Sequence, residues 1–203
     1  MQIAVLTGDL VRSTELDPHA LVITFEALER AAAEISQWQG ASTRLTRYRG
    51  DGWQMIVTRP NLALRAALKM IAAVRSLGEG HATRIAVGLG EGELGQGGSL
   101  ASAGGAAFVA SGRALDAIDP KVHLTIAATG AEGALYRLAD HVAKGWTPAQ
   151  SRAVEPLLAP DRPTHAAVAR QLGISRQAVE KALNGAGFGA IEASLELVET
   201  ADD

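Results

Sequence analysis

The sequence predicts an α+β fold in which a βαββαβ unit is followed by a small all-α unit. Over residues 1–128, short β-prone runs alternate with segments whose apolar residues recur at helical spacing. After residue 146 only helical patterns remain. A chain of 203 residues has room for one ordinary domain and a small second one. We therefore expect the domains to span 1–145 and 146–203.

The first strand, the first helix and a hairpin are marked by their boundary residues. The apolar run over 2–7 has the length of a strand and ends at Gly8. Asp17-Pro18 supplies a helix cap followed by proline at the first helical position, and Gly40 ends the apolar periodicity that follows. Two β-prone runs, 43–49 and 53–59, flank Gly50-Asp51-Gly52, a turn sequence that predicts a hairpin.

The rest of the first unit continues the alternation. Pro60 opens a helix that closes near Gly78, and the run over 83–89 is β-prone. A glycine-rich loop over 90–105 leads to a helix expected over 106–118 and a strand over 122–128. The first six of these elements follow the order βαββαβ, the ferredoxin-like pattern, for which we expect one sheet with helices on one face.

The second unit has the punctuation of a helix-turn-helix. Thr147-Pro148 caps one helix, the proline-rich stretch 160–163 breaks it, and Thr164 begins a short helix over 165–171. Gly173 suits a tight turn, and Ser175 caps a further helix over 176–184. The shared core of the pair is expected to consist of Leu172, Ile174, Val179 and Leu183.

The polar face of the last of these helices is the candidate DNA-binding surface. Recognition helices present exposed polar side chains to base edges and phosphates. Five basic and three acidic side chains lie in 146–190, whereas five acids and no base follow from Ile191, in an expected acidic C-terminal helix. This pattern predicts double-stranded DNA as a partner, and a helix hairpin used for packing or dimerisation is the alternative. The candidate contacts are Ser175, Arg176, Gln177, Glu180 and Lys181.

Two aspartates of the first unit form a candidate metal site. Asp9 follows a strand directly and Asp51 lies at the hairpin tip, on strands that are neighbours in this topology. Two adjacent carboxylates repel each other unless a cation lies between them, and Mg²⁺ is the usual cation where phosphates bind. Each aspartate also suits a purely structural role, Asp51 as a turn residue and Asp9 as a cap ahead of Ser13.

These residues carry a resemblance to class III nucleotide cyclases over about residues 1–128. Residues 7–14, TGDLVRST, resemble their first metal motif, and residues 49–53, RGDGW, resemble their metal-bearing hairpin. The resemblance implies a head-to-tail homodimer that binds a purine nucleotide with Mg or Mn. The site residues that it implies are Asp9, Leu10 (through its carbonyl) and Asp51 for the metal, Arg47 for the base and Arg113 for the transition state.

The chain also departs from the cyclase pattern. Val109 stands in place of the ribose-orienting asparagine and offers no hydrogen bond, although orienting the ribose hydroxyl is the chemistry that this asparagine serves. No lysine matches the residue that stabilises the triphosphate. Over its whole length, with Gly104–Phe108 as a further motif, the chain most resembles small bacterial SatD-like proteins, in which a cyclase-like domain precedes a sigma-factor-like helix-turn-helix.

Three functions remain open at this point. The leading hypothesis is a DNA-binding regulatory protein whose degenerate cyclase-like domain dimerises or senses a nucleotide. The alternative is an active Mg- or Mn-dependent purine nucleotidyl cyclase or a related nucleotide enzyme, and the third is a homodimeric interaction module with neither activity. The absence of cysteine excludes disulfides and thiolate chemistry. With no signal peptide and no run of roughly 20 apolar residues, we expect a cytoplasmic protein.

Overall fold

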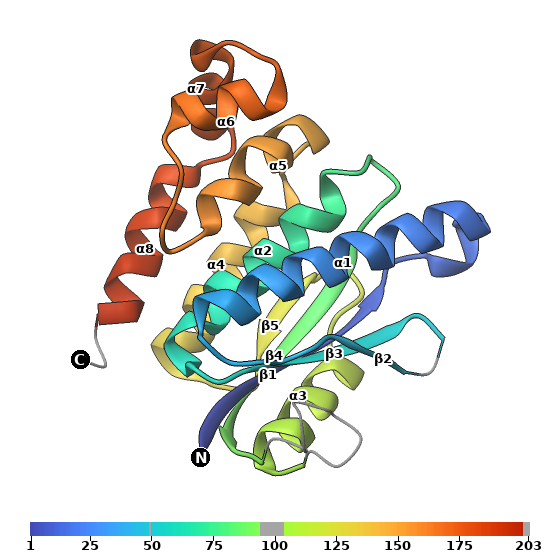
Figure 1. The fold of residues 1–203 in the computed structure, drawn as a ribbon. Coiled ribbons are helices and arrows are strands. Elements are labelled where there is room, and N and C mark those ends of the chain that lie inside the picture. The colour runs from blue at the N-terminus through green and yellow to red at the C-terminus, as the bar shows by residue number, and fades with distance from the viewer. Residues whose placement is uncertain (49, 94–103, 201–203) are drawn as a thin grey trace.

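A five-stranded mixed sheet lies at the centre of the fold, which is α+β as predicted (Figure 1). The computed structural model describes residues 1–48, 50–93 and 104–200. The strands are β1 (Gln2–Leu10), β2 (Thr46–Tyr48), β3 (Gly52–Val57), β4 (Thr83–Glu91) and β5 (Leu124–Ile126), in the order β2-β3-β1-β4-β5. The first four strands pair antiparallel, and β5 joins β4 in parallel.

The helices of the first unit cover both faces of this sheet, which corrects the expectation of helices on one face. They are α1 (Pro18–Trp38), α2 (Ala63–Arg75), α3 (Ala106–Asp116) and α4 (Gly130–Lys144). Figure 1 shows α1 and α2 on one side and α3 on the other. The reason lies in β1, where the consecutive residues Val5 and Leu6, which point to opposite faces of the sheet, are both fully buried in two separate apolar clusters. A strand that is apolar on both faces needs cover on both.

Most predicted boundaries are close to those observed, and the deviations have local causes. The Asp17 side chain accepts a hydrogen bond from the Ala20 amide (2.8 Å), and Gly40, with φ +62°, follows the helix end. Two strands are shorter than predicted, 46–48 instead of 43–49 and 124–126 instead of 122–128, because each lies at a sheet edge and pairs on one side. By contrast, β4 runs two residues further, to Glu91, since β1 pairs with it along its whole length.

The predicted helix over 60–78 is a 3₁₀ turn, η2 (Pro60–Leu62), followed by α2. Arg49 of the predicted hairpin and residues 94–103 of the glycine-rich loop lie outside the described residues.

The C-terminal helices pack on α2 and share the main apolar core. They are α5 (Pro148–Val154), α6 (His165–Leu172), α7 (Arg176–Gly185) and α8 (Phe188–Thr200), with the 3₁₀ turn η5 (Glu155–Leu158) after α5. Trp146, Leu157 and Leu195 belong to the same buried cluster as Leu68 of α2. The Arg65 guanidinium reaches across from α2 to both carboxylate oxygens of Glu199, at 2.6 and 2.9 Å. The helical unit is therefore docked on the sheet unit. Among the described residues, no helix combines the length and the apolar character needed to cross a membrane.

Candidate functional site

Three short helices, α5, α6 and α7, contact one another pairwise and form the C-terminal candidate site. Each helix begins with a side-chain cap, which explains why the sequence predicts their starts so closely. Thr147 and Gln150 form a reciprocal capping box, Thr164 accepts from the Ala167 amide (3.2 Å) and Ser175 accepts from the Ala178 amide (3.1 Å). Gly173 makes the turn between α6 and α7 with φ +66°, a conformation that costs little only for glycine.

The inner side of α7 holds it in place. Val179 and Leu183 are buried against α5 and α6, as predicted, and Leu172 is partly buried. Ile174 was expected in this core, but its side chain is 44% exposed. The reason is its place within the turn. Its amide donates to the Ala169 carbonyl (3.0 Å), and this closes the turn with the side chain on the outside.

The outer side of α7 carries the five residues predicted to contact DNA. Ser175, Arg176, Gln177 and Lys181 are exposed, and Glu180 is partly buried. Arg176 Nε donates to Glu180 Oε1 at 2.8 Å, one helical turn away. An exposed pair of this kind is worth at most about 1 kcal/mol, so Arg176 can exchange its partner for another anion.

The positive charge of the helical unit is concentrated on α6 and α7. Two of its five basic side chains, Arg152 and Arg162, lie outside these two helices and have partners within the chain. Arg152 donates to the Ser76 carbonyl (2.9 Å), and Arg162 is ion-paired with Glu192 and Glu196 of α8. The other three, Arg170, Arg176 and Lys181, are exposed on these two helices. The acidic side chains of α8 therefore neutralise Arg162 and leave the α6–α7 surface basic.

Asp9 lies in a polar corner at the end of β1, and its carboxylate is fully engaged. Arg84, its cross-strand partner on β4, donates to both oxygens, from Nε at 2.9 Å and from an Nη at 2.5 Å. The hydrogen bonds that Arg84 donates to Asp9 are the largest cause that raises the pKa of Arg84. Burial opposes this shift, and the charges of Asp9 and Asp51 reinforce it. Sequence reasoning assigned no site role to Arg84. Arg84 could have been found from its position opposite Asp9 on the neighbouring strand, but this position is known only once the strand pairing is known.

Asp51 lies at the hairpin tip and is also bonded within the chain. Ser13 Oγ donates to its Oδ2 at 2.5 Å, a partner that sequence reasoning did not foresee. The pairing of Gly8 with Trp53 places the hairpin tip beside the end of β1, so the two aspartates act on the same guanidinium. The two carboxylates therefore lie near one positive group, as predicted, but this group is the Arg84 guanidinium and not a metal ion.

This corner does not fit Mg or Mn as it stands. Mg²⁺ requires close to six oxygen ligands in octahedral geometry. Both oxygens of Asp9 are bonded to Arg84, one of Asp51 is bonded to Ser13, and the described residues contain no cluster of three acidic or histidine side chains. Leu10, whose carbonyl is the predicted third ligand, pairs with Thr83 at the end of β1, and its role as a ligand stays a prediction. A cation would have to displace Arg84 from Asp9.

The two predicted nucleotide-contacting arginines lie away from this corner within one chain. The Arg47 guanidinium stacks 3.5 Å from the ring centroid of Phe25, on the face of the sheet that α1 covers, whereas Asp9 lies on the α3 face. Arg113 is exposed on α3, as is Val109. Their roles in a nucleotide site remain predictions for an assembly of two copies.

Comparison with known proteins gives distant structural likenesses. No family model matches the sequence, and no curated protein matches it. Among solved structures, the chain is similar to the guanylyl cyclase Cya2, with a TM-score of 0.46 and 19% identity over 62% of this chain and 74% of that one. It is also similar to the catalytic core of a rhodopsin-guanylyl cyclase with converted specificity in complex with ATPαS. In that case the TM-score is 0.44, with 18% identity over 57% and 72% of the two chains.

Proposed function

We propose that this chain is a DNA-binding regulatory protein in which α5, α6 and α7 form a helix-turn-helix unit. In this proposal the sheet unit is a degenerate cyclase-like domain that serves dimerisation or ligand sensing. The observation that carries the proposal is α7 itself, whose inner side is anchored by Val179 and Leu183 while Ser175, Arg176 and Gln177 are exposed at its start. These residues are the ones that a recognition helix presents to DNA.

The position of α7 in the molecule supports this role. Figure 1 shows α6 and α7 at one end, beyond α5 and remote from the sheet. The major groove of B-DNA, about 12 Å wide, admits one helix, and nothing among the described residues covers the outer side of α7. In the groove, Gln177 suits an adenine edge, Arg176 a guanine edge, and Lys181 and Ser175 the phosphates. Glu180 orients Arg176 through their hydrogen bond.

A single copy presents few positive charges to DNA. Three exposed basic side chains on α6 and α7 give little non-specific affinity for DNA in a chain of net charge −3. Two copies that read two half-sites would double these contacts, so the proposal includes a homodimer.

The test begins with selection of binding sequences from a pool of random double-stranded DNA by the full chain. On a selected duplex, the double variant Arg176→Ala/Gln177→Ala should bind at least about tenfold more weakly, because each base contact contributes on the order of 1–3 kcal/mol. Lys181→Ala should weaken all duplexes alike and lower the salt dependence by about one counterion. Arg30→Ala, at an exposed position on α1, is the matched control. Failure to enrich any sequence, or equal binding by the double variant and the control, would overturn the proposal.

A nucleotide enzyme is the second candidate, and the convergence of Asp9, Asp51 and Arg84 favours it. In this case Arg84 would exchange Asp9 for a phosphate when a nucleotide and Mg or Mn bind. Purified protein with ATP or GTP and either metal should then form a cyclic product, and Asp51→Asn should abolish it. If neither turnover nor metal-dependent thermal stabilisation by any nucleotide is seen, this candidate is excluded and the DNA proposal is unaffected.

A further inference from the structure

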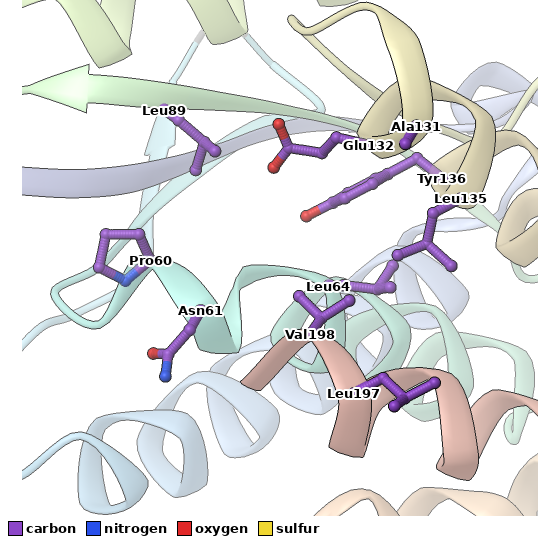
Figure 2. Close-up of a pocket in the computed structure, with 10 residues that line it drawn as sticks. All are labelled: Pro60, Asn61, Leu64, Leu89, Ala131, Glu132, Leu135, Tyr136, Leu197 and Val198. Atoms are coloured by element: carbon purple, nitrogen blue, oxygen red, sulfur yellow. The ribbon is translucent and has the colours of Figure 1, made fainter. Parts of the chain in front are cut away.

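A cavity of about 390 Å³ opens at the opposite end of the sheet from the aspartate corner, and neither function above uses it. Figure 2 shows it between η2, α2, the end of β4, α4 and α8. Its walls are mostly apolar and include Leu64, Leu89, Leu135 and Val198. A volume of roughly 300–1,000 Å³ with apolar walls and a few polar groups is characteristic of small-molecule sites.

The first polar group in this cavity is the hydroxyl of Tyr136. The residue is only 4% exposed, and Figure 2 shows its hydroxyl pointing into the cavity. Within the part of the chain that the structure describes, this hydroxyl has no hydrogen-bond partner, and it is not among the polar atoms closed off from solvent, so it is reached through the cavity. The side chain therefore has a free donor and acceptor in an otherwise apolar space.

The second polar group is the carboxylate of Glu132, one turn earlier on α4 and at the same cavity. Glu132 is exposed at the cavity and forms no ion pair with any described residue. Burial first, and the Glu132 charge second, raise the pKa of Tyr136 above its ordinary value. The hydroxyl is neutral near pH 7, as tyrosine ordinarily is, and it can both donate and accept a hydrogen bond.

We propose that this cavity binds a small organic amine with an apolar body and one protonated amino group. The leucine-rich walls take up the body, the Glu132 carboxylate pairs with the ammonium, and the Tyr136 hydroxyl accepts a second hydrogen from it. A carboxylic acid of the same shape is repelled by Glu132. A neutral molecule of the same shape gains no ion pair from this carboxylate, which is exposed and keeps its water.

The site also includes α8, which connects it to the rest of the helical unit. Leu197 and Val198 form one wall, and Leu197 is 73% exposed at its rim. Asn61 Nδ2 donates to the Glu199 carbonyl at 3.1 Å and so fixes α8 beside the opening. Binding at this site does not depend on DNA binding by α7, and the two proposals can fail separately.

The experiment titrates the ¹⁵N-labelled full chain with phenethylamine and, in parallel, with the neutral 2-phenylethanol and the anionic 3-phenylpropionate. Saturable shifts are expected for amide signals around Tyr136, Leu64 and Leu197, with the amine bound at least about fivefold more tightly than the alcohol. Tyr136→Phe keeps the apolar volume and should weaken amine binding by about three- to tenfold. Glu132→Gln should remove the preference for the amine over the alcohol. Glu26→Gln, at an exposed position on α1, is the control and should change nothing.

Two results would overturn the proposal. Equal binding of the amine and the alcohol by the unmodified chain would exclude an amine-specific site. The absence of saturable shifts, or shifts located elsewhere, would exclude the cavity as a site. Ala131→Trp, at an exposed position on the rim, provides a second criterion, because a filled cavity should no longer bind phenethylamine while the amide spectrum stays folded.

Discussion

Lys69 is an ammonium group placed inside the molecule, with 0% of the residue exposed. It is neutralised by Glu34 of α1 (2.6 Å) and by the Glu155 carboxylate, and it also donates to the Glu155 carbonyl (3.2 Å). The ring centroid of Trp38 lies 6.0 Å away. One side chain of α2 thereby connects α1, α2 and the C-terminal helices. A buried charge is tolerated only with such partners.

We expect Lys69→Met to lower the free energy of unfolding by about 2 kcal/mol. The loss stays below that of a fully buried pair because Glu34 and Glu155 are 48% and 24% exposed and can be hydrated. Glu34→Gln should cost less than about 1 kcal/mol, since Lys69 keeps Glu155. Urea unfolding of both variants measures the difference. Equal losses for the two variants would contradict the bridging role of Lys69.

His123 makes the stability of the folded protein depend on pH, and the direction of this dependence follows from its pKa. Burial is the main cause that lowers its pKa below the ordinary value, and the charges of Lys144, Arg75 and Arg84 act in the same direction against the attraction of Asp140. The unfolded chain therefore takes up a proton near pH 6.5, while the folded chain holds His123 neutral to lower pH. The stabilisation is complete above that pH and is lost as the pH falls toward the folded pKa.

The expected outcome is a lower urea midpoint at about pH 5.5 than at about pH 7.5, with part of this difference absent in His123→Gln. Burial also lowers the pKa of His81, against the charge of Asp17, so His81→Gln should remove a further part. NMR titration of the His123 ring gives its folded pKa directly. A His123 pKa above 6.5, or an unchanged pH dependence in both variants, would contradict this prediction.

At the scale of elements, the close contact between α3 and β4 depends on glycines, and Gly88 is the clearest of them. A Cβ placed on Gly88 would lie 2.3 Å from the Ala107 carbonyl oxygen and 2.5 Å from the Ser111 nitrogen, both on α3. The helix backbone therefore rests directly on the strand. Behind this contact, Thr7 and Ser111 share a buried hydrogen bond of 2.7 Å between the sheet and the helix.

Gly88→Ala should destabilise the protein by about 1–3 kcal/mol, because the helix must move away from the strand. Gly112 on the same helix is the matched control, since a Cβ there meets nothing within 4 Å. Gly112→Ala should stabilise by about 0.5–1 kcal/mol through helix propensity alone. Thermal unfolding of the two variants tests the pair. Equal shifts in the same direction would show that α3 does not pack on β4 at Gly88.

The elements that could be predicted from the sequence are those whose signals are local. The caps Asp17, Thr164 and Ser175 each bond to an amide three residues ahead, so the sequence alone contains both partners. The position of α3 was missed because it depends on which faces of the sheet remain uncovered. The apolar run of β1, unbroken from Ile3 to Leu6, was the available signal for two covered faces.

The same distinction explains the candidate sites. The exposure of Ser175, Arg176 and Gln177 follows from helical spacing, so it was predicted correctly. The bonding of Asp9 to Arg84 requires strand register, and the position of Arg47 over Phe25 requires the packing of α1, so neither was foreseen. The hydrophobicity of Ile174 predicts a core position, but the geometry of the turn leaves its side chain exposed.

At the scale of the molecule, the apolar core continues across residue 145, where a domain boundary is expected. Trp146 is 1% exposed and lies in the same cluster as Trp53, the tryptophan of β3. Trp146 Nε1 donates to the Ala186 carbonyl (2.8 Å), and its own carbonyl accepts from Arg75 Nε of α2 (3.0 Å). The helical unit is thus connected to the sheet unit through both backbone and side chains.

We expect the two units to unfold as one. With 5-fluorotryptophan in place of the three tryptophans, ¹⁹F NMR in urea reports Trp53 and Trp146 separately in an otherwise unchanged chain. Both signals should disappear at the same urea concentration, as a cooperative transition requires. Loss of the Trp146 signal at a lower concentration, with Trp53 still folded, would show two independent units.

Glu199→Gln extends this test, because it removes one charge of the largely buried Arg65–Glu199 pair between α2 and α8. In a single cooperative unit it should lower the midpoints of Trp53 and Trp146 together, by the equivalent of about 1–3 kcal/mol. A shift confined to Trp146 would mean that α8 stabilises only the helical unit. A common shift would mean that binding in the cavity beside α8 stabilises α7 as well, since any ligand of the folded state stabilises the whole cooperative unit.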